Sequence, residues 1–235
     1  MPEFIQELVS PMLSGVLTML FLVWFVFYRA TRKLFLTFWI GLVLWVWLVT
    51  VFLLAQQDKF FLKLSLSSLP NIGLLFVPII VGLNFLAKSS TFRKIVDNIS
   101  QPWLIGVQMT RMMGVMFLAL YARGLMPAEF AIPAGVGDVI VGTTAPLVAV
   151  MLFLNRPGAK KIAIVWNIVG FAELVLAIGL GFLTSPTPYQ TLALDRPNNF
   201  LFEFPLALIP TFAVPLSLLL HIFSLRVLLK RKTLS

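Results

Sequence analysis

Long apolar segments alternate with short polar loops from one end of the chain to the other. Each segment runs for about 20 residues, the length that an α-helix needs to cross the hydrocarbon core of a bilayer. The strands of a transmembrane barrel would instead alternate polar and apolar positions. The pattern predicts an all-α polytopic membrane protein, a bundle of seven transmembrane helices in a single domain, 1–235. The expected spans are 9–28, 34–55, 70–87, 102–122, 133–154, 162–183 and 205–229.

The basic residues between these spans are distributed unevenly. Thirteen follow the first, third, fifth and seventh spans, whereas four lie in the other loops, among six acidic residues. Because cytoplasmic loops carry the excess of lysine and arginine, this distribution predicts an outside N-terminus and a cytoplasmic C-terminus. Only an odd number of spans gives that arrangement. The expected location is the cell membrane, which in a bacterium is the inner membrane.

The composition excludes several classes of protein. With 60% hydrophobic and only 11% charged residues, the chain cannot cover a water-soluble surface. It has no cysteine and one histidine, which excludes disulfides, thiolate nucleophiles and multi-histidine zinc sites. The net charge of +9 lies in alternating loops, so we expect no nucleic-acid partner. We find no hydrolase, P-loop or dinucleotide-binding motif, and the protein is not expected to be an enzyme.

Three ionisable residues fall inside the predicted spans: Arg111, Asp138 and Glu173. Each costs roughly 2.5–3.5 kcal/mol at the centre of a membrane helix, so we expect them to face one another rather than lipid. Both acids share a helix face with glycine and alanine, where neighbouring helices approach closely. Counting the rise per residue places Arg111 and Glu173 near the midplane and Asp138 about 8 Å to the outer side, within reach of a long guanidinium. The sequence therefore predicts that Arg111 pairs with one or both carboxylates.

One base against two acids leaves this group one positive charge short. Either one carboxyl is protonated at neutral pH, or a bound cation or proton supplies the balance. A site that binds a small polar ligand or relays protons is one interpretation. The alternative is a structural ion pair that only fixes the register of the helices.

A second polar layer is predicted about 6–8 Å toward the cytoplasm from the middle of the spans. On α-helical spacing, Arg111 stacks with Gln108 and with Val115, and His221 lies on a stripe with two serines. Such layers can form a route for a proton or a ligand, and a packing histidine is an equal alternative for His221. The layer comprises Asn84, Gln108, Asn167 and His221.

The last span contains Pro205, Pro210 and Pro215. A proline inside a helix bends its axis and frees the carbonyl four residues earlier. The carbonyls of Leu206 and Thr211 are therefore candidates for ligand coordination. A helix that is merely kinked is the alternative.

Two further features concern the periphery of the bundle. The longest loop, 184–204, is predicted to lie outside, either as a lid or binding segment or as a cap over the ends of the last two spans. Trp39, Trp45 and Trp47 of the second span are expected to face lipid or headgroups.

Four methionines of the fourth span have the spacing i, i+3, i+4 and i+7, which in an α-helix places four thioethers on one face. With His221 they are candidate ligands for copper or haem, although methionine more often fills gaps in packing. We therefore expect no cofactor, with copper or haem as the alternative. The residues are Met109, Met112, Met113 and Met116.

Taken together, these patterns favour a transporter or channel-like carrier for a small polar solute or proton. A receptor, sensor or partner-binding subunit is the first alternative, with a membrane-protein partner or a second copy of the chain bound in the bilayer. A redox protein is the second.

Overall fold

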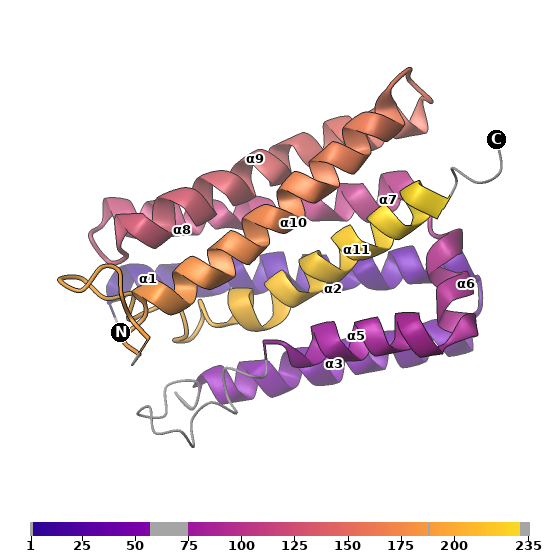
Figure 1. The fold of residues 1–235 in the computed structure, drawn as a ribbon. Coiled ribbons are helices and arrows are strands. Elements are labelled where there is room, and N and C mark those ends of the chain that lie inside the picture. The colour runs from indigo at the N-terminus through magenta and orange to yellow at the C-terminus, as the bar shows by residue number, and fades with distance from the viewer. Residues whose placement is uncertain (1, 57–74, 188, 231–235) are drawn as a thin grey trace.

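The computed structural model describes residues 2–56, 75–187 and 189–230 (Figure 1). It is 80% helical and has no strand within these residues, which confirms the all-α class. In the described part of the chain, six helical segments are long and apolar enough to cross a membrane, and the shorter apolar helix Val77–Lys88 lies where the third span is predicted. These features are compatible with a multi-pass membrane protein. Residues 70–74 of the predicted third span lie outside the described residues.

The observed helices begin and end within a few residues of the predicted spans. The fourth and seventh spans are each divided, because an eight-residue 3₁₀ helix (η3) and a five-residue π-helix (η4) interrupt the α-helical geometry. The elements are α1 (Glu3–Glu7), α2 (Val9–Thr31), α3 (Leu34–Gln56), α5 (Val77–Lys88), α6 (Ser90–Asn98), α7 (Gln101–Gly106), η3 (Val107–Gly114), α8 (Val115–Ala122), α9 (Ala128–Phe153), α10 (Ala159–Thr184), η4 (Ile209–Ala213) and α11 (Val214–Lys230).

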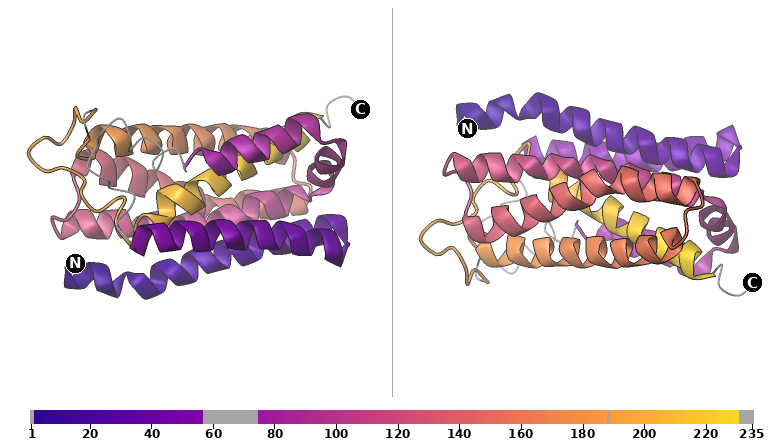
Figure 2. Two further views of the ribbon diagram at one scale, coloured as in Figure 1. Left: turned by 90° about the horizontal axis from the view of Figure 1, so that it is seen from below. Right: turned by 90° about the horizontal axis from the view of Figure 1, so that it is seen from above.

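The long helices run between the two ends of an elongated bundle, and the chain termini lie at opposite ends (Figures 1 and 2). The segment made of η4 and α11 occupies the centre: 72% of its apolar window is buried, against 22% for α3 and α10. Residues that project from α11 therefore face other helices in nearly every direction. This placement brings the polar stripe of the last span into the interior.

The basic segments gather at one end of the bundle. The α2–α3 connection, α6, the α9–α10 turn and the end of α11 all lie at the end opposite the N-terminus (Figures 1 and 2). The uneven charge distribution that the sequence shows along the chain is therefore an asymmetry between the two ends of the structure.

Helix α6 crosses this basic end and was not among the predicted elements. The side chain of Ser89 caps it by accepting a hydrogen bond from the backbone N–H of Phe92 at 3.1 Å. Near its end, Asp97 pairs with Arg226 at 2.9 Å and Lys230 at 2.6 Å, both on α11. The two contacts hold the connection between α5 and α7 against the last helix.

This junction makes a pH-dependent contribution to stability. Partial burial raises the pKa of Asp97, but hydrogen bonds from Lys230 and Arg226 and their positive charges outweigh it, so the pKa lies below its ordinary value. The stabilisation is therefore present above the pKa of the unfolded chain and is lost as the pH falls through the folded pKa. We expect Asp97→Asn to cost up to about 1 kcal/mol at pH 7 and progressively less below about pH 4. Melting temperatures of both proteins across this range test it; a constant difference would contradict it.

The prolines of the last span have a specific structural effect. The π-helix η4 contains Pro210, and Pro215 is the second residue of α11, which follows it directly. The carbonyl that Pro215 leaves free, that of Thr211, accepts a hydrogen bond from Nε1 of Trp47 at 3.0 Å. The carbonyl of Leu206 accepts one from the backbone N–H of Ile209 at 2.9 Å. Each carbonyl already accepts one hydrogen bond in this conformation, and its role in ligand coordination stays a prediction.

Trp47 also corrects the expected position of the second-span tryptophans. Trp39 and Trp45 are 49% and 48% exposed, as expected for side chains that face lipid, whereas Trp47 turns inward to η4. Replacing Trp47 by phenylalanine leaves the Thr211 carbonyl without its donor, which we expect to cost about 1 kcal/mol of unfolding free energy. Trp45→Phe is the matched control and should cost less. Equal losses in a detergent-unfolding titration would show that this hydrogen bond contributes nothing.

Candidate functional site

The site begins with the geometry of η3. A 3₁₀ helix has three residues per turn, so side chains three apart stand directly above one another. Gln108, Arg111 and Gly114 form such a row, and all three are buried against the neighbouring helices. An eight-residue 3₁₀ segment inside a span is unusual and places this whole row on the interior side.

The same geometry overturns the predicted methionine face. With 120° between successive residues, Met109 and Met112 align with each other and are each 46% exposed. Met113 is partly buried and Met116 is buried. The four thioethers do not converge on one face. Val115, expected on the interior stripe with Arg111, is 53% exposed for the same reason.

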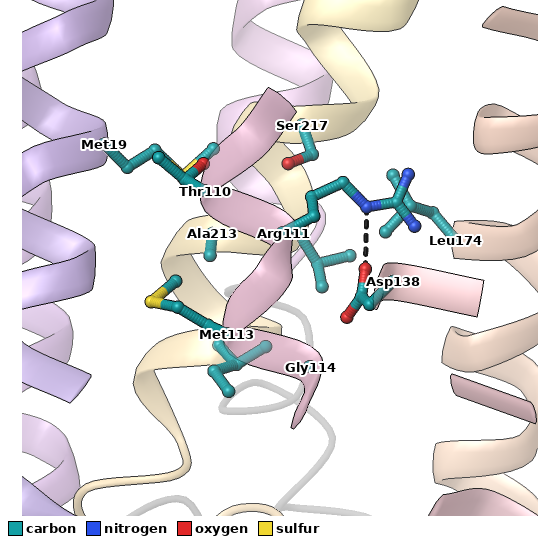
Figure 3. Close-up of a pocket in the computed structure, with 11 residues that line it drawn as sticks. Met19, Thr110, Arg111, Met113, Gly114, Asp138, Leu174, Ala213 and Ser217 are labelled. Carbon is teal, nitrogen blue, oxygen red and sulfur yellow. Dashed lines mark hydrogen bonds and ion pairs between the residues drawn. The ribbon is translucent and has the colours of Figure 1, made fainter. Parts of the chain in front are cut away.

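Arg111 joins the two acids. Its Nε donates to Oδ1 of Asp138 at 2.6 Å (Figure 3), and its Nη2 forms an ion pair with Oε2 of Glu173. Its Nη1 donates to the carbonyl of Gly170 at 3.1 Å and lies 3.2 Å from Nε2 of His221. The side chains of Arg111, Asp138 and Glu173 retain 3%, 11% and 13% of their exposure. We call these three residues the charge cluster; the predicted meeting of the three side chains is confirmed.

Glycines on the adjacent helices make room for each member of the charge cluster. A Cβ atom on Gly114 would lie 2.3 Å from Cβ of Asp138, and one on Gly137 would lie 2.5 Å from Cγ of Glu173. A Cβ on Gly170 would lie 2.6 Å from Cε1 of His221 and 3.3 Å from Nη1 of Arg111. Close approach at small residues is the usual way in which membrane helices pack. Here it also determines where the charged groups fit.

A line of hydrogen bonds runs from the charge cluster to the basic end of the bundle. Because Arg111 can only donate, Nε2 of His221 accepts, and Nδ1 of His221 donates to Oδ1 of Asn167 at 3.0 Å. Asn167 donates to Oγ of Ser224 at 2.9 Å, and that hydroxyl donates to Oε1 of Gln101 at 2.8 Å. In each of these hydrogen bonds the residue nearer to Arg111 is the donor, so all the hydrogen bonds of the line have the same orientation.

This line does not have the chemistry of a proton wire. Asn167 stands in the middle of it, and a carboxamide holds both its N–H protons at neutral pH and does not pass one on. The line instead fixes His221 as a neutral ring beneath Arg111. Two other members of the predicted polar layer lie off it. Gln108 donates to the carbonyl of Ser217 at 3.0 Å, and Asn84 is exposed on α5, where it donates to Ile80 of its own helix.

Asn84 is therefore wrongly placed in the predicted polar layer, because the face of α5 that carries it does not turn toward α11.

The candidate copper or haem ligands also fail to assemble. Both ring nitrogens of His221 are occupied by Arg111 and Asn167, while Met109 and Met112 face outward. Within the described residues, no three His, Asp or Glu side chains are grouped as a metal site would require.

Two narrow cavities meet at Asp138. The first lies between α2, η3 and η4–α11 and is lined by Arg111, Met113 and Ser217 among others (Figure 3). The second extends toward the end of the bundle that holds the N-terminus and reaches Phe202 of the loop before η4. Each has room for only about one or two water molecules, so a larger ligand requires side chains or helices to move.

Comparison with known proteins gives one match. The model of the family described as Domain of unknown function (DUF8737) matches residues 69–229, which is more than half of the chain, and the chain belongs to this family. The matched segment contains the whole charge cluster. No curated protein and no solved structure matches the chain.

Proposed function

We propose that the protein is a seven-span membrane transporter, with its N-terminus outside and its C-terminus in the cytoplasm. In this proposal the charge cluster takes up a proton or a small cation and releases it on the other side, without a chemical step. The six long helical segments make six of these spans, and the apolar segment that ends with α5 is the third span in chain order. The basic end of the bundle faces the cytoplasm.

The unbalanced charge of the cluster is the observation that carries this proposal. Arg111 supplies one positive charge, and Asp138 and Glu173 together supply two negative charges when ionised. His221 accepts a hydrogen bond from Arg111 and is therefore neutral. A buried ion pair with only a structural role needs one base and one acid. A site that exchanges a positive charge needs a second acid whose negative charge the base does not balance.

The interruptions of the helices support movement at the same place. The cavity at Arg111 is lined from η3 and from η4, the 3₁₀ and π segments of two different spans. Irregular backbone at membrane depth occurs where it is buried in protein or lines a cavity, and transporters commonly form their sites at broken helices. Since the hydrogen-bonded line below Arg111 is not a proton wire, release toward the cytoplasm is expected to follow a rearrangement of these segments.

Proton flux into liposomes tests the proposal. The purified chain is reconstituted with a pH-sensitive dye inside the vesicles, and a potassium diffusion potential drives the flux. We expect the wild-type protein to exceed empty liposomes and Asp138→Asn to lose the excess. Glu129→Gln is the matched control, since it removes an exposed acid at one end of α9, and it should keep the flux.

The amount of folded protein in each vesicle preparation is measured by size-exclusion chromatography before reconstitution. Arg111→Gln is the second variant and is also expected to lose the excess flux. If Asp138→Asn, folded and reconstituted at the wild-type level, carries the same flux as the wild type, the proposal is wrong. A wild-type protein indistinguishable from empty liposomes would contradict the transport of protons by the charge cluster.

A further inference from the structure

The cavity that extends from Asp138 toward the N-terminal end of the bundle has an unusual lining. Four phenylalanine rings from α8, α9, α10 and the segment before η4 surround it, and Asp138 stands at its inner end. Every other residue that the structure places in its wall is apolar. We call it the aromatic cavity, and its rings are those of Phe117, Phe130, Phe182 and Phe202.

The rings are arranged in two pairs. Phe117 and Phe130 meet edge to face with their centroids 5.1 Å apart, and Phe182 and Phe202 are tilted with centroids 6.4 Å apart. Phe117 and Phe130 are almost fully buried, whereas Phe182 is only partly buried and can move more readily. A π-face attracts a cation, and it attracts one more strongly where water is excluded.

Two carboxylates face one guanidinium at the inner end. Nε and Nη1 of Arg111 contact Asp138, Gly170 and His221 through hydrogen bonds, and Nη2, which makes no hydrogen bond in the described part of the chain, forms the ion pair with Glu173. Asp138 uses Oδ1 for Arg111, and no contact within the described residues engages its Oδ2. Oε1 of Glu173 has no hydrogen-bond partner there either. Because two carboxylates stand against one guanidinium, the site suits a positive group better than an anion.

We propose that the aromatic cavity binds a lipophilic monovalent cation, an ammonium or quaternary ammonium that carries an apolar or aromatic group. Its charged group lies against Asp138 and its apolar part among the four phenylalanine rings. The inference deepens the proposed function and rests on it, because it assigns a class of substrate to the same cluster. Entry of such a cation requires the partly buried Phe182 to swing aside, since the cavity as it stands holds about two water molecules.

Binding of radiolabelled benzyltrimethylammonium to the purified full-length chain in detergent micelles tests this inference by equilibrium dialysis. We expect saturable binding that falls by about tenfold or more in Asp138→Asn, because a buried charged partner is lost. Phe182→Leu should weaken binding severalfold while leaving the charge in place. Asp97→Asn removes the same charge at the opposite end of the bundle and should bind as the wild type does.

The uncharged isostere neopentylbenzene, which has the same shape with carbon in place of nitrogen, is the matched ligand control. It should not compete for the labelled cation. Equal binding of the cation to wild type and Asp138→Asn, or effective competition by neopentylbenzene, overturns the inference. If Asp138→Asn does not fold, the binding of the cation to Phe182→Leu and the competition by neopentylbenzene decide whether the inference holds. Absent cation binding together with Asp138-dependent proton flux refutes only this inference, and cation binding without proton flux and without uptake of the labelled cation into liposomes refutes only the proposed transport.

Discussion

Replacing Arg111 by methionine is expected to lower the free energy of unfolding by about 3–5 kcal/mol, the largest loss of any substitution considered. The methionine fills a similar volume but leaves Asp138 and Glu173 facing each other without a counter-charge. It also removes the donor to Nε2 of His221 and to the carbonyl of Gly170. Reversible unfolding in mixed micelles of a mild and a denaturing detergent measures the difference.

A protein in which both carboxylates have been neutralised separates the effect of the lost charge on stability from the effect of the lost packing. In a protein that already carries Asp138→Asn and Glu173→Gln, the same Arg111→Met change no longer strands two carboxylates. We therefore expect it to cost less than half as much there. If the two losses are equal, the three side chains are not coupled, and the charge cluster is not the unit that the distances suggest.

The second large effect concerns the contact between η3 and α9. A Cβ on Gly114 would lie 2.3 Å from Cβ of Asp138, and both atoms belong to or adjoin the backbone, so neither can turn away. Gly114→Ala is expected to cost about 3 kcal/mol, because η3 must shift from α9 or Asp138 must leave Arg111. It should also reduce proton flux more than its stability loss alone explains.

Gly179→Ala is the control for this substitution. Gly179 lies within α10, and a Cβ there would meet no atom within 4 Å. Because alanine has the higher helix propensity, the unfolding free energy should stay the same or rise by up to about 1 kcal/mol. A Gly114→Ala protein as stable as Gly179→Ala would show that the close packing at Asp138 is absent.

The positions of the helices were predictable because apolar length is a strong signal in a membrane protein. The observed α9 and α10, Ala128–Phe153 and Ala159–Thr184, contain or nearly contain their predicted spans. The meeting of Arg111 with Asp138 and Glu173 was predictable for an energetic reason, since charges at that depth must find one another. Neither inference required knowledge of side-chain packing.

Two of the errors come from a departure of the backbone from the α-helix. The methionine face and the position of Val115 both assumed 100° per residue across a segment that turns by 120°. Nothing in the residues 107–114 identifies a 3₁₀ helix, although glycines at positions 106 and 114 bound it. Trp47 turns inward to the Thr211 carbonyl, and that hydrogen bond joins two spans far apart in the sequence.

Helix α6 was missed although a local signal was present. Ser89 followed by a short amphipathic segment is an N-cap pattern, and the structure shows the capping hydrogen bond to Phe92. Its single acid, Asp97, is the partner of two basic residues on α11, a contact that no spacing rule predicts across that distance in sequence. The aromatic cavity likewise combines rings from four elements and needed the folded chain to be recognised.

Proton flux through folded Glu173→Gln tests the central claim most directly, because this substitution balances the charge cluster at one base and one acid. The change removes little packing, and we expect the variant to keep the wild-type free energy of unfolding within about 1 kcal/mol. If the second acid exists to exchange a positive charge, flux in liposomes falls to the level of empty vesicles although the protein is folded. Flux equal to that of the wild type would show that the cluster is an ion pair that only holds the helices together.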